Sequence, residues 1–301
     1  MRNVFAETLY KEAIKNKKIY VVAADISPAG SMEKLRKKYP DRFVNTGVAE
    51  QSMIGISAGL AMRGMKPFAY TIATFALYRP FEMIRDDICY QNLPVTIVGM
   101  GAGTIYSTLG GTHLTQEDIS IARSIPNMTV LAPSDLYEMK SCIKYLSKFS
   151  KNPCYLRIGK SGEKDYIFKE STKWKFGKIR KICDGENKTC IVTYGPIIKT
   201  AIEVKKKSNI AIFSAHTLKP FDYKSLKNIL KKYKKIIILE DHSEIGGLSS
   251  ICKEFAHDHG FQKKIKNFSL KDKFFHFYGS QKELLEKKHG ITVEKILKEV
   301  V

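Results

Sequence analysis

Residues 43–62 read FVNTGVAEQSMIGISAGLAM, and this stretch decides the fold of the first half of the chain. It holds a single charged residue, Glu50, and an arginine stands directly outside it at each end. The polar pair Asn45-Thr46 and the glycine after it predict a loop that ends in a helix N-cap. Residues 48–62 then predict a helix that is rich in small side chains and lacks a charged face. A helix that is apolar all round is buried.

Glu50 is therefore predicted as an isolated carboxylate in the first turn of a buried helix. An unpaired charge is costly to bury, so a chain that keeps one there commonly uses it. An acidic residue at a helix N-terminus also stabilises the helix through its dipole. The residues alone leave both interpretations of Glu50 open, a functional group or a helix cap.

The segment GVAEQSMIGISAGLAMRG at residues 47–64 resembles the pyrimidine-domain motif of the transketolase family of thiamine diphosphate enzymes. In that family the glutamate of the motif faces the aminopyrimidine ring of the cofactor. The resemblance therefore implies that thiamine diphosphate is the cofactor and that Glu50 is both catalytic and cofactor-binding. The cofactor itself would supply the carbanion chemistry.

The length of 301 residues allows two ordinary domains, and hydrophobic and aromatic contents of 44% and 11% are typical of a globular protein. No apolar run is long enough to cross a membrane. The start, MRNVFAETLYKEAIKNKK, does not resemble a signal peptide. We therefore expect a cytoplasmic protein with no membrane partner.

Six cysteines are scattered without a C-x-x-C pair, which favours reduced structural thiols over a zinc site or a disulfide framework. His257 and His259 flank Asp258 on a predicted helix, where their rings would lie on different faces. We expect both histidines on the surface and predict no metal ligands in this chain.

The formal net charge of +21 raises the question of a nucleic-acid partner. The lysines, however, are spread over the whole chain, and no aromatic-rich basic motif accompanies them. We therefore expect a solvated, lysine-rich surface and no nucleic acid. The charge would also help to attract an anionic substrate or an acidic partner subunit.

Apolar, β-branched runs alternate with helical patterns along the chain, which predicts parallel sheets covered by helices. Strands are predicted at 19–24, 67–72, 95–100, 129–132 and 154–158, and again at 190–194, 210–214 and 236–240. Helices are clearest at 134–149, after Ser134 as N-cap, and near 222–233, 248–258 and 292–300.

The more polar segment after residue 160 predicts a connection between two units. The predicted fold class is therefore α/β with two domains, each a mainly parallel sheet covered by helices. By resemblance these are a pyrimidine-binding domain at 1–165 and a transketolase C-terminal domain at 186–301. The connecting segment is expected at 166–185.

An aromatic set follows the helix in the segment GMKPFAYTIATFALYR. In the resembled family, aromatic residues after the proline form the wall of the pyrimidine pocket. This assigns Ile72, Phe75 and Tyr78 to cofactor binding, on one face of a turn that leaves a strand. Ile72 departs from the usual aromatic. The alternative for all three residues is ordinary core packing.

The strand after this set leads into a glycine-rich loop, GMGAGTIYSTLGGTH, which resembles the family's G-x-x-x-G-x-D-G-x-T-H loop. His113 matches the histidine that faces the reacting sugar atoms, so the resemblance implies a catalytic and substrate-binding role. The later segment SIPNMTVLAPSD supports this register. Leu109 replaces the usual acidic residue, which contacts a donor hydroxyl in transketolase. The standard donor specificity is therefore in doubt.

Two cationic residues match positions that contribute to gripping the substrate phosphate in the family. Arg2 lies 23 residues before Asp25, which ends a predicted strand. Lys160 falls where an arginine often binds a phosphate, in the segment NPCYLRIGK. A lysine binds phosphate as a point charge, without the bidentate fork of arginine. The alternatives are a disordered terminus for Arg2 and a charged residue opening the connection for Lys160.

The second half carries LKPFD, LEDHSEIGGL and YGSQKELLEKKHGIT, which resemble the C-terminal domain of transketolases and deoxyxylulose-phosphate synthases. Gly246-Gly247, before a predicted helix, forms a potential anion site. The resemblance gives this domain structural and assembly roles and no catalytic one.

The chain lacks the G-D-G motif and the later asparagine with which the family holds Mg²⁺ and the diphosphate. A doubly charged diphosphate needs a metal or cations in a glycine-rich cradle. The resemblance therefore implies a split enzyme, in which a separate N-terminal subunit supplies the diphosphate and Mg²⁺ site. We expect two copies of this chain as a homodimer within a heterotetramer.

The expected function is that of the C-terminal subunit of a transketolase, which transfers a two-carbon ketol unit between sugar phosphates. It would be active only with its N-terminal partner. The alternatives are an enzyme similar to 1-deoxyxylulose-5-phosphate synthase or to the beta subunit of a 2-oxoacid dehydrogenase. A catalytically silent, transketolase-like assembly protein is the non-enzymatic alternative.

Overall fold

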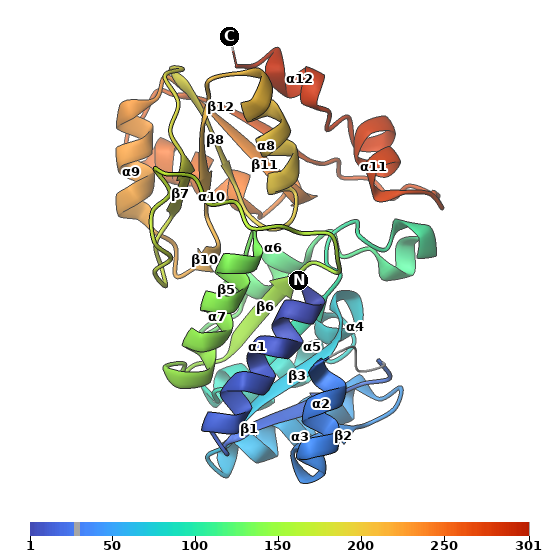
Figure 1. The fold of residues 1–301 in the computed structure, drawn as a ribbon. Coiled ribbons are helices and arrows are strands. Elements are labelled where there is room, and N and C mark those ends of the chain that lie inside the picture. The colour runs from blue at the N-terminus through green and yellow to red at the C-terminus, as the bar shows by residue number, and fades with distance from the viewer. Residues whose placement is uncertain (27–30, 301) are drawn as a thin grey trace.

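The computed structural model describes residues 1–26 and 31–300, which form two β-sheets flanked by helices (Figure 1). Residues 27–30 and Val301, the last residue of the predicted second domain, lie outside this description. No described helix is long and apolar enough to cross a membrane.

The seven-stranded sheet has the order β10-β5-β6-β4-β3-β1-β2 and is parallel except for β10. Its strands are β1 Ile19–Ala23, β2 Phe43–Asn45, β3 Lys66–Ile72, β4 Thr96–Met100, β5 Thr129–Leu131, β6 Cys154–Ile158 and β10 Thr217–Lys219. Alternate strand residues pack on opposite faces, as with Val98 and Ile97, so each face has its own hydrophobic cluster. The parallel sheet requires crossovers, and helices supply them on both faces.

The α-helices described in this half are α1 Arg2–Lys15, α2 Ser31–Lys38, α3 Glu50–Met62, α4 Ala73–Leu77, α5 Phe81–Met83, α6 Asp118–Ser124 and α7 Leu136–Lys148, and a π-helical segment, Ile84–Tyr90, continues α5. Helices α1 and α7 lie against each other over one face (Figure 1). Helix α7 begins with Asp135 as its N-cap, whose Oδ1 accepts a hydrogen bond from the Glu138 N–H. The predicted cap Ser134 is one residue too early, and its hydroxyl contacts the Ser214 hydroxyl instead.

The five-stranded sheet has the order β12-β11-β8-β9-β7 and is parallel except for β7. Its strands are β7 Arg180–Cys183, β8 Thr189–Thr193, β9 Ala211–Ser214, β11 Lys235–Ser243 and β12 Lys264–Leu270. Its helices are α8 Ile198–Lys207, α9 Tyr223–Lys232, α10 Leu248–Asp258, α11 Gln281–Glu283 and α12 Val293–Leu297. Strand β7 lies inside the segment predicted as a connection.

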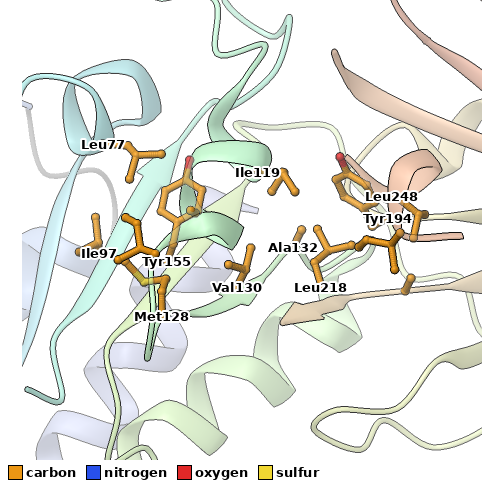
Figure 2. Packing of buried hydrophobic residues seen from close by; sticks show 14 of the residues in the cluster. Leu77, Ile97, Ile119, Met128, Val130, Ala132, Tyr155, Tyr194, Leu218 and Leu248 are labelled. Carbon is orange, nitrogen blue, oxygen red and sulfur yellow. The ribbon is translucent and has the colours of Figure 1, made fainter. Parts of the chain in front are cut away.

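The two halves of the chain share one hydrophobic core. Strand β10 comes from the second half and pairs antiparallel with β5 of the first, Thr217 opposite Leu131. The core cluster that results joins Val130, Ala132 and Tyr155 to Tyr194, Leu218 and Leu248 (Figure 2). Because nonpolar surface is buried across the junction, the two sheets are held in a fixed relation.

Helix α3 differs from its prediction, because it is not buried all round. Met53 and Ile54 are fully buried, but Val48, just before the helix, is 69% exposed and Met62 is 65% exposed. Ile56, on the same helix, is also exposed. Helix α3 therefore lacks a charged face although part of its surface, with apolar side chains, is exposed to solvent in the single chain.

All six cysteines are buried and free, as the scattered spacing predicts. Burial is the largest influence on each thiol and raises its pKa above the ordinary value, as for Cys142 and Cys252. His257 and His259 are exposed, as predicted. The described residues contain no group of three or more His, Cys, Asp or Glu side chains that could hold a metal ion.

Gly246-Gly247 does not form an open anion site. The carboxylate of Glu240, on β11, accepts hydrogen bonds from the backbone N–H groups of Leu248 (2.8 Å) and Ser249 (3.1 Å). A Cβ on Gly247 would lie 2.4 Å from a Glu240 oxygen, so only glycine fits there. The protein thus fills the N-terminus of α10 with its own carboxylate, and the anion-site prediction is wrong.

Candidate active site

Glu50 is the first residue of α3, which starts beside the carboxyl ends of the parallel strands β1 and β3. Ligands of open α/β sheets bind at this edge. The residue is 3% exposed. The N-cap is Ala49, and Glu50 is the acidic residue of the first turn, a position that also favours the helix dipole. Both carboxylate oxygens accept hydrogen bonds from Nη1 of Arg79, at 3.0 and 3.1 Å.

Asn45 and Thr46, predicted to cap α3, make no side-chain hydrogen bond to the first N–H groups of the helix. The Thr46 hydroxyl donates to the carbonyl of Ala23, at 3.2 Å, and to that of Ala49, at 3.1 Å. The Asn45 side chain accepts from the N–H of Gly47, which has a φ of +67°. A positive φ favours glycine, and this turn delivers the chain to Glu50 without a side-chain cap.

Phe75 lies at the centre of the candidate site. The Arg79 guanidinium carbon lies 4.2 Å from the centroid of its ring, within cation–π range. The His113 ring meets Phe75 edge to face, with centroids 5.2 Å apart. The structure therefore brings together Glu50, Phe75 and His113, three of the predicted site residues, with Arg79 between them.

His113 belongs to a short 3₁₀ turn, Gly111–His113, in the glycine-rich loop. Burial and the positive charge of Arg79 both lower the pKa of this histidine below its ordinary value. The imidazole is consequently neutral at pH 7, with one nitrogen as donor and one as acceptor. Its Nδ1 lies 2.9 Å from the Thr112 hydroxyl.

Ile72 and Tyr78 are not brought into this group. The Tyr78 hydroxyl donates to a Glu117 oxygen at 2.8 Å, and the ring packs against the cluster around Tyr155. Ile72 packs against the cluster around Val98, on the other face of the sheet. Because β3 ends at Ile72 and helix α4 follows, the side chains do not share one face. Their part in cofactor binding stays a prediction.

The predicted phosphate ligands meet at a second point. Arg2 is in the first turn of α1, and its N–H donates to the carbonyl of Lys160 at 3.3 Å. The Lys160 ammonium lies 4.6 Å from the centre of the Tyr106 ring, whose centroid is 6.2 Å from that of His113. The Tyr106 ring therefore contacts both the Lys160 ammonium and the candidate histidine, and Arg2 joins Lys160 through its backbone.

A polar cavity of about 300 Å³ opens beside Lys160, between the two halves of the chain. Ser134 and Ser161 from the first half and Lys199 and Gln281 from the second contribute to its lining. Cations and hydroxyls of this kind suit an anionic group, and the one carboxylate of the lining, Glu163, is paired with the N-terminal amine of Met1. Leu109 is 49% exposed on the glycine-rich loop, and no carboxylate occurs between residues 99 and 115.

The glycine-rich loop is fastened to the C-terminal half. Asp241, on β11, accepts a hydrogen bond from the Thr104 hydroxyl at 2.9 Å and another from Gln281 at 3.2 Å. The Ser107 hydroxyl donates to the Gly279 carbonyl at 2.7 Å. Through these hydrogen bonds, the C-terminal half helps to fix the position of the glycine-rich loop.

Sequence reasoning missed Arg79 and Asp241. Arg79 follows Phe75 by four residues, a spacing at which two side chains can meet on a helix, so a signal was available. Asp241 lies in the motif LEDHSEIGGL, but no pattern there connects it to residue 104, which is 137 positions away.

Family models match almost the whole chain. A model described as "Transketolase, pyrimidine binding domain" matches residues 1–162, and one described as "Transketolase, C-terminal domain" matches residues 177–296. The chain therefore belongs to the transketolase family. The resemblance and the fold class predicted from the sequence are both confirmed.

Relatives of two lengths are similar to this chain. A Methanocaldococcus jannaschii protein, provisionally named a transketolase C-terminal section, is 37% identical across 100% of this chain and 95% of its own length. A 1-deoxy-D-xylulose-5-phosphate synthase of Clostridium perfringens is 32% identical over 98% of this chain but 48% of the synthase. The chain thus spans about half of such synthases.

A solved structure has the same fold over nearly its full length. It is titled as a split gene transketolase in an inactive β4 tetramer. It superposes with a TM-score of 0.87 at 29% identity and covers 99% of this chain and 96% of that one.

Proposed function

We propose that this chain is the C-terminal subunit of a split thiamine diphosphate-dependent transketolase, which transfers a two-carbon ketol unit between sugar phosphates. The observation that carries the proposal is the grouping of Glu50, Phe75 and His113 at the carboxyl edge of the first sheet. A buried carboxylate beside an aromatic face is suited to a planar nitrogen heterocycle.

The described residues fit one half of the cofactor. Glu50 would bind the aminopyrimidine ring and Phe75 would pack on its face, while Ile72 and Tyr78 remain proposed parts of the pocket. When bound, the cofactor supplies the carbanion stabilisation that ketol transfer requires. The described residues offer no metal cluster for the diphosphate half. We therefore propose that Mg²⁺ and the diphosphate are held by a partner.

The side chains of this chain then have separate tasks. Glu50 would hold a proton at the ring nitrogen of the pyrimidine, because its carboxylate is buried and both its oxygens bond to one donor that a ring could replace. Neutral His113 would exchange hydrogen bonds with sugar oxygens. Arg2 and Lys160 would hold the sugar phosphate by charge, with Tyr106 between them and the histidine.

The proposed partner is a separate N-terminal transketolase subunit, in a heterotetramer that contains two copies of this chain. Apolar side chains are exposed at both ends of α3 and along it, Val48 near Glu50, Ile56 in the helix and Met62 at its last residue, which supports an additional subunit on this helix. The name of the split-gene relative agrees with this arrangement. A cytoplasmic location is part of the same proposal.

A second candidate is a two-carbon transfer of the 1-deoxyxylulose-5-phosphate synthase type. It is favoured by the 32% identity to the Clostridium perfringens synthase and by Leu109, which provides no acceptor for a donor hydroxyl. Comparison of sugar phosphates with pyruvate as donors, in the reconstituted enzyme, distinguishes the two functions.

The substitution Glu50→Gln tests the proposal. Glutamine keeps the shape but cannot titrate, so we expect a loss of about a hundredfold or more in turnover. The direct measurement is hydrogen–deuterium exchange at the thiazolium carbon in the complex with the partner. Glu82→Gln, at an exposed position of the short helix α5, is the control for loss of a carboxylate. Exchange by Glu50→Gln at the wild-type rate would disprove the proposed role.

The uncombined chain should bind thiamine diphosphate with Mg²⁺ weakly or not at all, because the proposed diphosphate site is on the partner. Titration calorimetry measures this directly. Tight binding by the single chain would contradict the split arrangement.

A further inference from the structure

Arg79 makes two contacts in the candidate site. Its Nη1 donates to both oxygens of Glu50, and its planar guanidinium lies over the face of Phe75, 4.2 Å from the ring centroid. The group is therefore a flat hydrogen-bond donor stacked on the same ring and joined to the same carboxylate that the proposed cofactor needs.

An aminopyrimidine ring would need the same two anchors, an aromatic face and the Glu50 carboxylate. The Arg79 guanidinium bonds to both carboxylate oxygens and lies over the Phe75 ring, so it competes with a pyrimidine ring for both anchors. We propose that Arg79 stands in the place of the pyrimidine ring in the uncombined chain and moves away when the ring binds. This inference rests on the proposed function of Glu50.

Arg79 is the partner that can move. Its side chain is 45% exposed, whereas that of Glu50 is 4% exposed. It follows the end of α4 at Leu77, outside the regular helix. Because the incoming ring would take over the bond to Glu50, displacement of the half-exposed arginine leaves no unpaired buried charge.

The ion pair with Arg79 also stabilises the buried carboxylate of Glu50. A buried carboxylate without a partner is strongly destabilising, and Arg79 compensates the charge of Glu50 until a ring nitrogen takes over. The same arginine faces His113, whose pKa it lowers together with burial. Movement of Arg79 away from the site would therefore raise the pKa of His113 as well.

The experiment uses the uncombined full chain and 4-amino-2-methylpyrimidine, which lacks the thiazolium and the phosphates. Ligand-observed NMR titration compares wild type with Arg79→Met. We expect the variant to bind this ring about fivefold more tightly or better, the factor equivalent to release from a half-exposed ion pair. The gain should disappear in the double variant Arg79→Met/Glu50→Gln.

Arg85→Met is the matched control, because it removes the same charge from a surface pair with Asp86. It should leave affinity for the ring unchanged. Free guanidinium ion at millimolar concentration should compete with the ring in Arg79→Met by refilling the vacated place. The pKa of His113, followed by NMR, should rise in Arg79→Met and verifies that the folded site has lost its cation.

Arg79→Lys keeps the charge without the planar stack and covers the case in which the methionine variant does not fold. It should show a smaller gain in affinity. Unchanged or weaker ring binding in the folded Arg79 variants would overturn the inference and would mean that Arg79 does not block the ring. The proposed function fails separately, through normal thiazolium exchange by Glu50→Gln.

Discussion

Asp241 accepts hydrogen bonds from both the backbone N–H of Thr104 (3.1 Å) and its hydroxyl (2.9 Å). Asp241 is buried, and burial raises the pKa of its carboxyl, while Arg157 opposes that rise. Thr104 lies in the loop that leads to His113. A residue of the C-terminal half thus holds the loop that carries the candidate histidine.

Asp241→Asn should loosen this loop without unfolding the protein. The amide can accept at its oxygen only, so one of the present donors loses its partner. We expect turnover of the reconstituted enzyme to fall about tenfold, a typical effect of misplacing a reacting group. Hydrogen-exchange mass spectrometry should show faster exchange in residues 101–115 and unchanged exchange in α7. Asp222→Asn, at the cap of α9, is the control for the loss of a buried carboxylate.

Leu109→Asp should change the choice of donor. The aspartate restores an acceptor for a sugar hydroxyl on an exposed loop position, so the free energy of unfolding should change by less than about 0.5 kcal/mol. A panel of donor substrates, tested with wild type and variant in the reconstituted enzyme, measures the effect. An identical ranking of donors in both enzymes would show that Leu109 does not contact the donor.

Glu240→Ala should open the N-terminus of α10. The variant loses four hydrogen bonds, from Leu248, Ser249, Tyr194 and Ser269, and we expect destabilisation by about 3 kcal/mol or more. Sulfate should then raise the melting temperature of the variant more than that of wild type, because an anion can occupy the vacated helix end. Equal shifts in both proteins would refute this.

His216→Phe should stabilise the protein increasingly as the pH falls. His216 is fully buried, and burial, with Arg180, lowers its pKa to about 3. The unfolded chain therefore binds a proton below about pH 6.5 that the folded chain does not, so wild type loses stability on acidification. The advantage of the variant should grow by about 2 kcal/mol between pH 6.5 and pH 5. Urea unfolding at both pH values checks this, and a constant difference contradicts it.

Most of the fold follows from the sequence because buried parallel strands give continuous apolar runs. Residues 154–158 were predicted and form β6 with the same bounds. The short strands β2 and β10 were not predicted, since each has three residues and depends on a distant partner. Strand β12 was also missed, because its first half, KIKN, is polar and partly exposed. Strand β7 was not predicted, because its polar residues form buried ion pairs, such as that of Arg180 with Asp135, and so do not give an apolar run.

The candidate site was predictable where a local motif marks it. Glu50 and His113 both lie in recognisable segments. The structure connects His113 to Phe75 by ring contact and Glu50 to Phe75 through Arg79. The contacts that depend on the tertiary fold were not predictable. Arg79 fills the space beside Glu50, and Tyr78 turns to Glu117, through packing that no single segment encodes.

The burial of all six thiols has a practical consequence for chemical labelling. A raised pKa keeps each native sulfur in the thiol form, and maleimides react with exposed thiolates. One cysteine introduced at an exposed position, such as that of Leu109, would therefore be the reactive one, with no need to remove the natural six. A fluorophore attached there would report directly on the movement of the loop as ligand and partner arrive.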